Sequence, residues 1–387
     1  MFGDSKIKAL YSEDDQRSLT DKRRRQQGII KNEAGEWVLL RHADVKSAAL
    51  DDATFSSHVS RFLQIPNGLD GAEHDQYRAL INRYLSQDAI TPYVPLFQHV
   101  ATELVSGLPK GEVINAVTDI GTVFAVRAQC QWLGWPAEVE PILVQWVNDN
   151  HQASRLKDHT KLATVAQDFN EIIRSVIAPF RDTDSAAASH NKANQDSITA
   201  QLCREQIKGR PLNEAEIVSI LRNWTGGDLG SMALCVGVVV AYLAHHPKQL
   251  QHCANASDAE LEAIIDEILR LDNPFPSNRR ITKCPVTLGE HQLPEGAKVH
   301  LDWISANRDE AVFGKDTFDP VRHAADNLVY GIGRHVCPGR LLATWQLRIL
   351  IRALLAHVEA ITPAPNESFE RQLPPLGGYS RVPVVLS

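Results

Sequence analysis

The sequence has no hydrophobic run long enough to cross a lipid bilayer. Its longest apolar stretch covers residues 232–244, whereas a membrane-spanning helix needs about 20 apolar residues. Residues 1–25 are polar and charged and have no apolar centre of the kind that a secretory signal has. We therefore expect a cytoplasmic protein without a membrane anchor.

Cysteine is scarce and the charge is nearly balanced. The six cysteines form no C-x-x-C pair and have no regular spacing, which excludes a disulfide framework and favours a reducing compartment. The formal net charge is −7, which argues against nucleic-acid binding through phosphate neutralisation. The hydrophobic fraction of 43% is enough for a large core.

Apolar residues recur at helical spacing over most of the chain. This periodicity predicts helices over 163–177, 213–246, 257–273 and 341–358. Asn213 followed by Glu216, and Ser257 followed by Glu260, are signals of a helix start. Short apolar runs predict strands at 37–40, 286–288, 298–301 and 382–386. The expected fold class is mainly α with small β-sheets, and the polar stretch 182–196 is expected to be an exposed loop.

The most informative segment is YGIGRHVCPG, residues 330–339. Two glycines predict a tight turn before Cys337, and Pro338 favours the first position of the amphipathic helix that follows. A cysteine at a helix N-terminus is favoured as a thiolate, and a thiolate is a good metal ligand. One cysteine cannot form a closed zinc site, which needs four ligands. One protein ligand suffices where a macrocycle such as haem supplies the other four.

This segment resembles the haem-binding loop F-G-x-G-x-H-x-C-x-G of the cytochromes P-450, with Tyr330 in place of the usual phenylalanine. The resemblance implies the cytochrome P-450 fold and haem b bound through Cys337. It implies four further cofactor contacts from the same loop: Tyr330, Gly331, His335 and Gly339. It covers residues 37–387, expected to form a single haem-thiolate monooxygenase domain, whereas residues 1–36 match weakly.

Two further motifs occur in the family's order. Glu267 and Arg270 match E-x-x-R, and their spacing places both side chains on one helix face. The resemblance implies that they form a structural ion pair with Arg322 of FDPVR as its third member. Taken alone, E-x-x-R equally fits a surface ion pair.

The two propionates of haem need cationic partners. The family's H-x-x-x-R motif is matched by His74 and Arg78, although an exposed helix turn would look the same. In the family another propionate arginine lies upstream of V-x-L-G…P-x-G. Counting back without gaps from residues 286–296 gives Arg280, with Arg279 as the alternative.

The helix predicted over 213–246 contains three glycines within WTGGDLGS, residues 224–231. Each glycine should cost ~1 kcal/mol inside a helix, so something must approach the backbone closely here. Two interpretations fit: a helix–helix packing site, or, as the resemblance implies, a long central helix that crosses the haem and leaves room for bound oxygen.

In the family this site reads A/G-G-x-D/E-T-T, and the acid and the alcohol deliver protons. Matched by motif, Asp228 is the acid and a leucine replaces the threonine. Counting back without gaps from the end of the helix instead puts Gly230 at the acid and Ser231 at the alcohol. We favour Asp228 as the proton-relay acid, with Ser231 or Thr225 as the hydroxyl.

The resemblance implies a monooxygenase that inserts one oxygen atom from O2 into a small hydrophobic substrate. Electrons from NAD(P)H would come through separate partners, a ferredoxin and a ferredoxin reductase. Family position puts substrate contacts at five residues: Phe62, Trp224, Gly227, Phe275 and Tyr379. Two alternatives remain: the same haem performing oxidative coupling, dehydrogenation or peroxide-driven oxidation, and a non-catalytic haem sensor.

Two groups of basic residues have less specific interpretations. Four arginines after the glycine-rich turn fit either docking of an acidic ferredoxin or a solvated charged face: Arg334, Arg340, Arg348 and Arg352. The run DKRRR, residues 21–25, is interpreted as a solvated helix turn.

Overall fold

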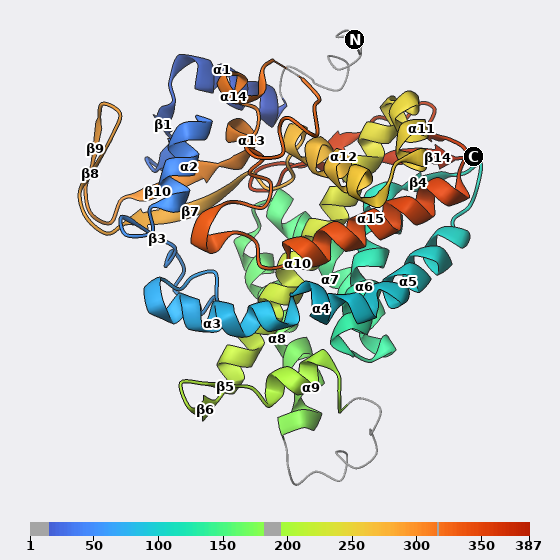
Figure 1. The fold of residues 1–387 in the computed structure, drawn as a ribbon, viewed down its shortest axis with the longest axis horizontal. Coiled ribbons are helices and arrows are strands. Elements are labelled where there is room, and N and C mark those ends of the chain that lie inside the picture. Colours follow the sequence, from blue (N-terminus) through green and yellow to red (C-terminus); the bar gives the residue numbers. More distant parts are fainter. Residues whose placement is uncertain (1–14, 182–194, 316) are drawn as a thin grey trace. The chain divides into compact units, whose positions relative to one another are not determined.

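The computed structural model describes residues 15–181, 195–315 and 317–387. The chain forms two compact units, each assembled from separate segments (Figure 1). The first contains Met1–Val59, Ala256–Cys337 and Arg371–Tyr379. The second contains Ser60–Asn255, Pro338–Glu370 and Ser380–Ser387. Most of the stretch predicted as a loop at 182–196 lies outside the described residues.

The first unit is built on a five-stranded sheet in the order β1-β2-β10-β7-β3. Strands β2 and β10 pair in parallel, and the other neighbours pair antiparallel. Its elements are α1 (Gln16–Gln26), β1 (Ile29–Lys31), β2 (Trp37–Leu39), α2 (His42–Leu50), β3 (Phe55–Ser56), α12 (Asp258–Leu271), β7 (Ser277–Thr282), β8 (Val286–Leu288), β9 (His291–Leu293), β10 (Lys298–Asp302), α13 (Trp303–Ala306), α14 (Glu310–Phe313) and η7 (Gly333–His335).

Helix α1 belongs to this unit and is fixed in it by buried charges. Arg308 donates to Asp21 at 2.7 Å, and Arg24 donates to the Ser305 carbonyl at 2.7 Å. All three charged side chains are at least nine-tenths buried. The interpretation of residues 21–25 as a solvated turn is therefore wrong for Asp21 and Arg24, which are buried, and holds for the other three residues, which are exposed. The partners of Asp21 and Arg24 lie more than 280 residues away in the chain.

The second unit is mainly helical. Its helices are α3 (Gly71–Tyr84), α4 (Gln87–Ile90), η2 (Thr91–Tyr93), α5 (Val94–Ser106), η3 (Ala116–Thr122), α6 (Val123–Leu133), η4 (Ala137–Val139), α7 (Glu140–Arg155), α8 (His159–Arg181), α9 (Ile198–Cys203), α10 (Glu214–His245), α11 (Pro247–Asn255) and α15 (Arg340–His357). Its strands are β4 (Val113–Asn115), β5 (Gln206–Ile207), β6 (Arg210–Pro211), β11 (Ile361–Pro363) and β14 (Pro383–Leu386). Two further short strands, β12 (Glu370–Arg371) and β13 (Tyr379–Arg381), span the points where the chain passes between the units. The predicted fold class, mainly α with small β-sheets, is confirmed.

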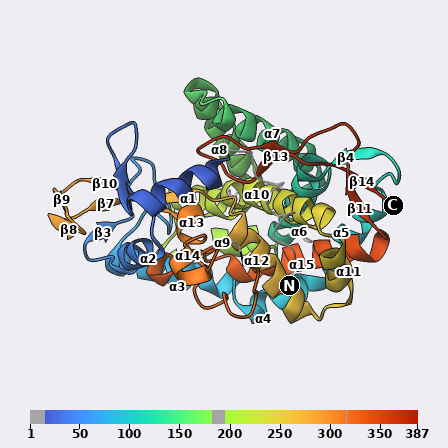
Figure 2. The same cartoon turned by 90° about the horizontal axis from the view of Figure 1, so that it is seen from above.

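Helix α10 is the central helix of the second unit and packs against α6, α7, α8, α11 and α15 (Figure 2). It begins with the predicted capping box, in which Asn213 and Glu216 each accept the other's backbone N–H. Among the described residues it is the one helix long and apolar enough to cross a membrane, and 78% of its most apolar window is buried inside the fold. Such burial is typical of a core helix.

Candidate functional site

The glycine-rich loop of the first unit is held in a closed turn by its backbone. The Cys337 N–H donates to the Tyr330 carbonyl at 2.9 Å, and the Val336 N–H donates to the Gly333 carbonyl at 3.1 Å. Gly331 and Gly333 have φ of +70° and +76°, a region that other residues rarely adopt. The Cys337 side chain is left half-buried.

Helix α2 sets the position of this loop within the unit. A Cβ atom at Gly333 would lie 3.0 Å from Leu50 Cδ2 and 3.3 Å from the Ala49 carbonyl oxygen, so a side chain here would require α2 to shift. Ile332 packs against the core that covers the sheet, and Arg334 forms an ion pair with Asp52. Packing against α2 and the core, together with one ion pair, therefore holds the loop in place.

The helix after the loop starts within one residue of the predicted start at 341, but Pro338 lies outside it. Helix α15 begins at Arg340 with Gly339 as its N-cap, so the prediction that Pro338 occupies the first helical position is wrong. The glycine follows the proline and has non-helical backbone angles (φ −85°, ψ 9°), which delays the first turn. Cys337 thus precedes the helix by two residues.

Glu267 and Arg270 of α12 form the predicted ion pair, and both side chains are 1% exposed. Arg270 donates Nε and Nη2 to the carboxylate at 2.7 and 2.9 Å. Glu267 also accepts the Asp319 backbone N–H at 2.9 Å and contacts His323 Nδ1 at 2.7 Å. A buried charge pair is favourable only when its remaining hydrogen-bonding positions are satisfied, and here they are.

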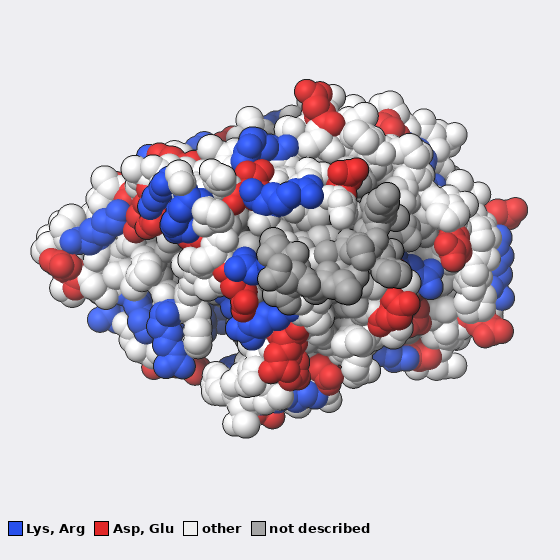
Figure 3. Space-filling model, turned by 90° about the horizontal axis from the view of Figure 1, so that it is seen from below, with Lys and Arg blue, Asp and Glu red and all other residues white. Residues whose placement is uncertain are grey.

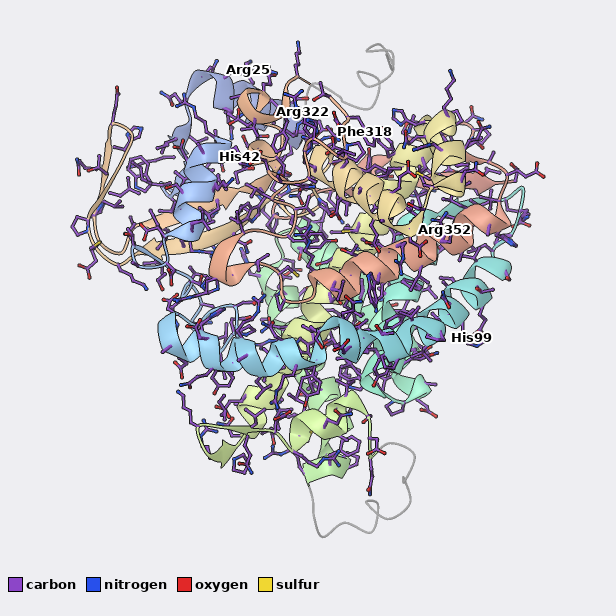
Figure 4. The ribbon with its side chains drawn as sticks, in the orientation of Figure 1. Arg25, His42, His99, Phe318, Arg322 and Arg352 are labelled. Atoms are coloured by element: carbon purple, nitrogen blue, oxygen red, sulfur yellow. The ribbon has the colours of Figure 1, made fainter. Side chains whose placement is uncertain are left out.

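The third member of this cluster is His323, which corrects the prediction of Arg322. Arg322 is exposed, and only its backbone N–H has a role, donating to Asp319 Oδ1 at 3.0 Å. Figure 4 labels Arg322 on the loop that follows α14. The chain makes a helical turn here, with His323 N–H bonded to the Asp319 carbonyl, and consecutive side chains in such a turn point in different directions.

Asn307 connects the ion pair to the cysteine loop, and no sequence motif indicated this. Its carbonyl accepts from Arg270 Nη1 at 2.5 Å, while its side-chain oxygen accepts from the Leu328 N–H at 2.7 Å. The Leu328 carbonyl then accepts from the Gly331 N–H at 2.9 Å. Three successive hydrogen bonds therefore connect the ion pair to the loop.

The predicted propionate partners lie in both units. In the first unit, Arg280 is buried and Arg279 is exposed on β7, which favours Arg280 as the inward-facing cation. In the second unit, His74 and Arg78 lie on α3; His74 is buried, and Arg78 Nε donates to Asn82 at 2.8 Å. His335 is half-buried in the cysteine loop.

The donor set fits a haem better than a metal bound by protein alone. In the described part of the chain, no group of three or more His, Cys, Asp or Glu side chains is placed to hold a metal ion. Cys337 is a single half-buried thiol on a glycine loop. A closed zinc site needs four protein ligands, whereas haem needs only one thiolate and cations for its propionates.

The polar residues of α10 differ in their surroundings. Thr225 is buried and donates its hydroxyl to the Leu221 carbonyl at 2.6 Å, so it does not support the predicted role as relay hydroxyl. Ser231 is half-buried, and its hydroxyl donates to the Gly227 carbonyl. Asp228 is half-buried, and burial raises its pKa to about 7 because the charged form loses hydration.

The three glycines within residues 224–231 of α10 have two kinds of surroundings. A Cβ at Gly226 would lie 2.8 Å from Phe169 Cε1, and one at Gly230 would lie 2.8 Å from His151 Nε2. These two glycines are helix–helix packing positions, as the first interpretation proposed. Gly227 has nothing within 4 Å of its Cβ position, so open space adjoins the backbone there.

The aromatic residues assigned to the substrate fall into two groups. Trp224 is buried against Tyr84 and Trp132, and Tyr379 is buried under Arg371 and hydrogen-bonded to Asp272. These two rings fill the core, so the structure does not support them as substrate contacts. Phe275 is half-buried and Phe62 is 59% exposed, and both remain candidates.

The arginines assigned to a docking face have partners of their own. Besides the Arg334–Asp52 pair, Arg352 on α15 (Figure 4) donates to the Cys253 carbonyl at 3.1 Å, and Arg348 lies 5.6 Å from the Trp345 ring. On the face shown in Figure 3, basic and acidic side chains are interspersed. The contacts of Arg334, Arg348 and Arg352 favour the interpretation of these arginines as part of a solvated charged face.

Comparison with known proteins is consistent across sequence and structure. A family model described as Cytochrome P450 matches residues 147–377. Cyclomarin C epoxidase from Salinispora arenicola is 28% identical over 345 residues, covering 84% of each chain. Erythromycin C-12 hydroxylase from Saccharopolyspora erythraea is 25% identical over 378 residues, covering 92% of this chain and 93% of the relative.

A solved structure has the same fold over nearly the whole length. The complex of a P450 EryK mutant with erythromycin B aligns with a TM-score of 0.85 at 22% identity, covering 98% of this chain and 96% of that one. The structure of CYP109E1 from Bacillus megaterium with testosterone aligns with a TM-score of 0.81 at 20% identity.

Proposed function

Because the chain belongs to the cytochrome P450 family, we propose that this haem-thiolate monooxygenase inserts one oxygen atom from O2 into a small hydrophobic organic molecule, with Cys337 as the iron ligand. The observation that carries the proposal is the half-buried thiol of Cys337 on a loop in which two glycines adopt the left-handed backbone conformation. Haem, when bound, supplies the oxidising chemistry, and a thiolate ligand favours O–O bond cleavage.

Other residues hold the cysteine loop and neutralise the propionates. The Glu267–Arg270 pair fixes the loop through Asn307. Arg280 supplies positive charge for one propionate. His74 and Arg78 in the second unit supply hydrogen bonds and charge for a propionate as well, and His335 donates from the loop itself.

Proton delivery is assigned to Asp228. With a pKa of about 7, its carboxyl takes up and releases protons near neutral pH, as a general acid should. Ser231 is the accompanying hydroxyl, because it is half-buried whereas Thr225 is buried, although each donates to the carbonyl four residues earlier. Gly227 leaves space beside the helix for oxygen or for an ordered water.

Membership of the family supports the proposed substrate class and electron donors. Phe62, Phe275 and the open side of Gly227 are proposed to contact an apolar substrate. The family implies redox partners; we propose a ferredoxin and an NAD(P)H-dependent ferredoxin reductase, and a cytoplasmic location. Relatives named for a cyclomarin, an erythromycin and linalool support a hydrophobic natural product as the substrate class.

The test is turnover under two oxidant conditions. Ligands are first screened by the change that they cause in the haem spin state. Each binding ligand is then incubated with NADPH, a ferredoxin, its reductase and isotopically labelled O2, and in parallel with peroxide alone. One labelled oxygen atom per product supports the proposal. Turnover with peroxide alone would instead favour the peroxide-driven alternative.

Replacing Asp228 with asparagine should separate activity from stability. We expect turnover to fall by about 10²-fold, the lower end of general-acid contributions. The carboxyl has an ordinary pKa of 3.8 and about 7 in the fold, so the folded state binds the proton more tightly. Its contribution to stability is present below pH 4 and is lost as the pH rises to 7.

The melting temperature of the Asp228→Asn variant should therefore exceed that of the parent at pH 8 and equal it at pH 4. The control is Asp168→Asn at an exposed position on α8, which should change neither the turnover nor the melting temperature. A variant with full turnover at pH 7 would remove Asp228 from the relay.

A further inference from the structure

The imidazole of His151, on the last turn of α7, lies against the backbone of α10 at Gly230. A Cβ atom at position 230 would be only 2.8 Å from His151 Nε2, closer than side chains pack. The ring is also hydrogen-bonded to the Gly230 backbone. A side chain at position 230 would therefore displace the imidazole, although the two residues lie 79 positions apart in the chain.

A polar ring at this place is not explained by packing. One helical turn earlier, the equivalent space at Gly226 is filled by Phe169 and Trp146, whose nearest atoms lie 2.8 and 3.3 Å from the Cβ position. These rings stack on each other with centroids 4.1 Å apart. An imidazole costs more to bury than a hydrocarbon ring. Burial lowers the pKa of His151 to about 4, so the ring is neutral at pH 7.

Position 230 of α10 is a glycine, so the helix itself provides no side chain there. Counting back without gaps from the end of the helix puts Gly230 where the family has an acid and Ser231 where it has an alcohol. We propose that His151 of α7 takes the place of the missing side chain at position 230 and acts as a positioning residue for the proton-relay segment of α10. This inference rests on the proposed role of that segment.

Two carbonyls of the segment accept side-chain hydrogen bonds. Ser231 donates to the Gly227 carbonyl, and His151 contacts the Gly230 backbone. Three glycines weaken this stretch of helix by ~1 kcal/mol each, so these bonds hold it in one conformation. Asp228 lies between the two held positions, so the role proposed for His151 is to hold the stretch of backbone that carries the Asp228 side chain.

Two substitutions of His151 distinguish the contribution of its hydrogen bond from that of its ring. His151→Gln keeps an N–H near the Nε2 position, whereas His151→Phe keeps a planar ring and loses the donor. Amide hydrogen exchange over residues 228–235 is measured in the haem-loaded protein, without turnover. We expect exchange to be about 10-fold faster in the phenylalanine variant, the effect of one net hydrogen bond, and close to the parent in the glutamine variant.

The control is His99→Phe on α5, an exposed histidine labelled in Figure 4, which should leave the exchange unchanged. Parent-like exchange in His151→Phe would overturn the proposal. So would a change confined to ligand affinity, because that would make His151 a substrate contact.

A swap tests whether the two positions are one functional unit. Gly230→Glu alone should lower the melting temperature, because its Cβ meets the imidazole. Gly230→Glu combined with His151→Ala should restore both the melting temperature and the fraction of NADPH electrons that reaches product rather than hydrogen peroxide. A double variant no better than Gly230→Glu alone would contradict the proposal. Exchange and melting are measured without substrate, so a protein that shows the expected exchange and melting results but makes no product would refute only the proposed function.

Discussion

Replacing Glu267 with glutamine should destabilise the protein by about 3–5 kcal/mol, the cost of leaving a buried charge without its partner. Arg270 would keep its charge at 1% exposure and lose its carboxylate. The Asp319 N–H and His323 would lose the same acceptor. Because hydrogen bonds of Asn307 link this cluster to the cysteine loop, we also expect the variant to bind less haem. Denaturant unfolding and the ratio of haem to protein measure the two effects.

Exposed Glu295 provides the control, and Glu295→Gln should change the unfolding free energy by no more than about 0.5 kcal/mol. A loss of less than about 1 kcal/mol in Glu267→Gln, within the range of exposed pairs, would mean that the carboxylate is not the centre of the cluster.

The neighbouring pair Arg322 and His323 tests which residue completes the cluster. His323→Ala should cost about 1–3 kcal/mol, because it removes a buried partner of Glu267. Arg322→Ala should stay within about 0.5 kcal/mol, since that side chain is exposed. The reverse order of the two effects in denaturant unfolding would restore Arg322 as the third member.

Replacing Cys337 with serine should reduce turnover by at least about 10²-fold, or about 2.7 kcal/mol in barrier height. The sulfur is lost, but the loop closure is not, because the bond at 2.9 Å to Tyr330 comes from the backbone N–H of residue 337. We therefore expect a folded protein with weakly held haem. Product formation per folded protein is the measurement.

The matched control is Cys284→Ser, which changes an exposed cysteine of the same unit and should leave turnover unchanged. Equal loss in both variants would indicate a general sensitivity to cysteine replacement, and no loss in Cys337→Ser would remove the proposed iron ligand.

Local sequence rules predicted the parts of this protein whose partners are close in the chain. The capping box of α10 joins residues three apart, and the cysteine loop closes between Tyr330 and Cys337. The Glu267–Arg270 pair lies within one helix turn. In each case backbone geometry alone brings the groups together.

The missed features depend on tertiary contacts or on turn geometry. The buried pairs of α1 and the contact of His151 with Gly230 join distant segments, so neither periodicity nor motif could reveal them. His323 was overlooked because a single turn is too short for a sequence pattern to show which of its side chains points inward. The glycine-rich stretch of α10 indicated that something approaches the backbone closely. Which side chain approaches each glycine depends on the packing of α7 and α8 against α10.

The central claim is that one sulfur atom, that of Cys337, binds the haem iron. The most direct measurement is the absorption spectrum of the dithionite-reduced protein under carbon monoxide, which reports the atom opposite the bound gas. We predict the long-wavelength Soret band of a thiolate-ligated haem in the parent and its loss in Cys337→Ser. A colourless protein, or a Soret band at the position given by a nitrogen ligand in the parent, would contradict the account.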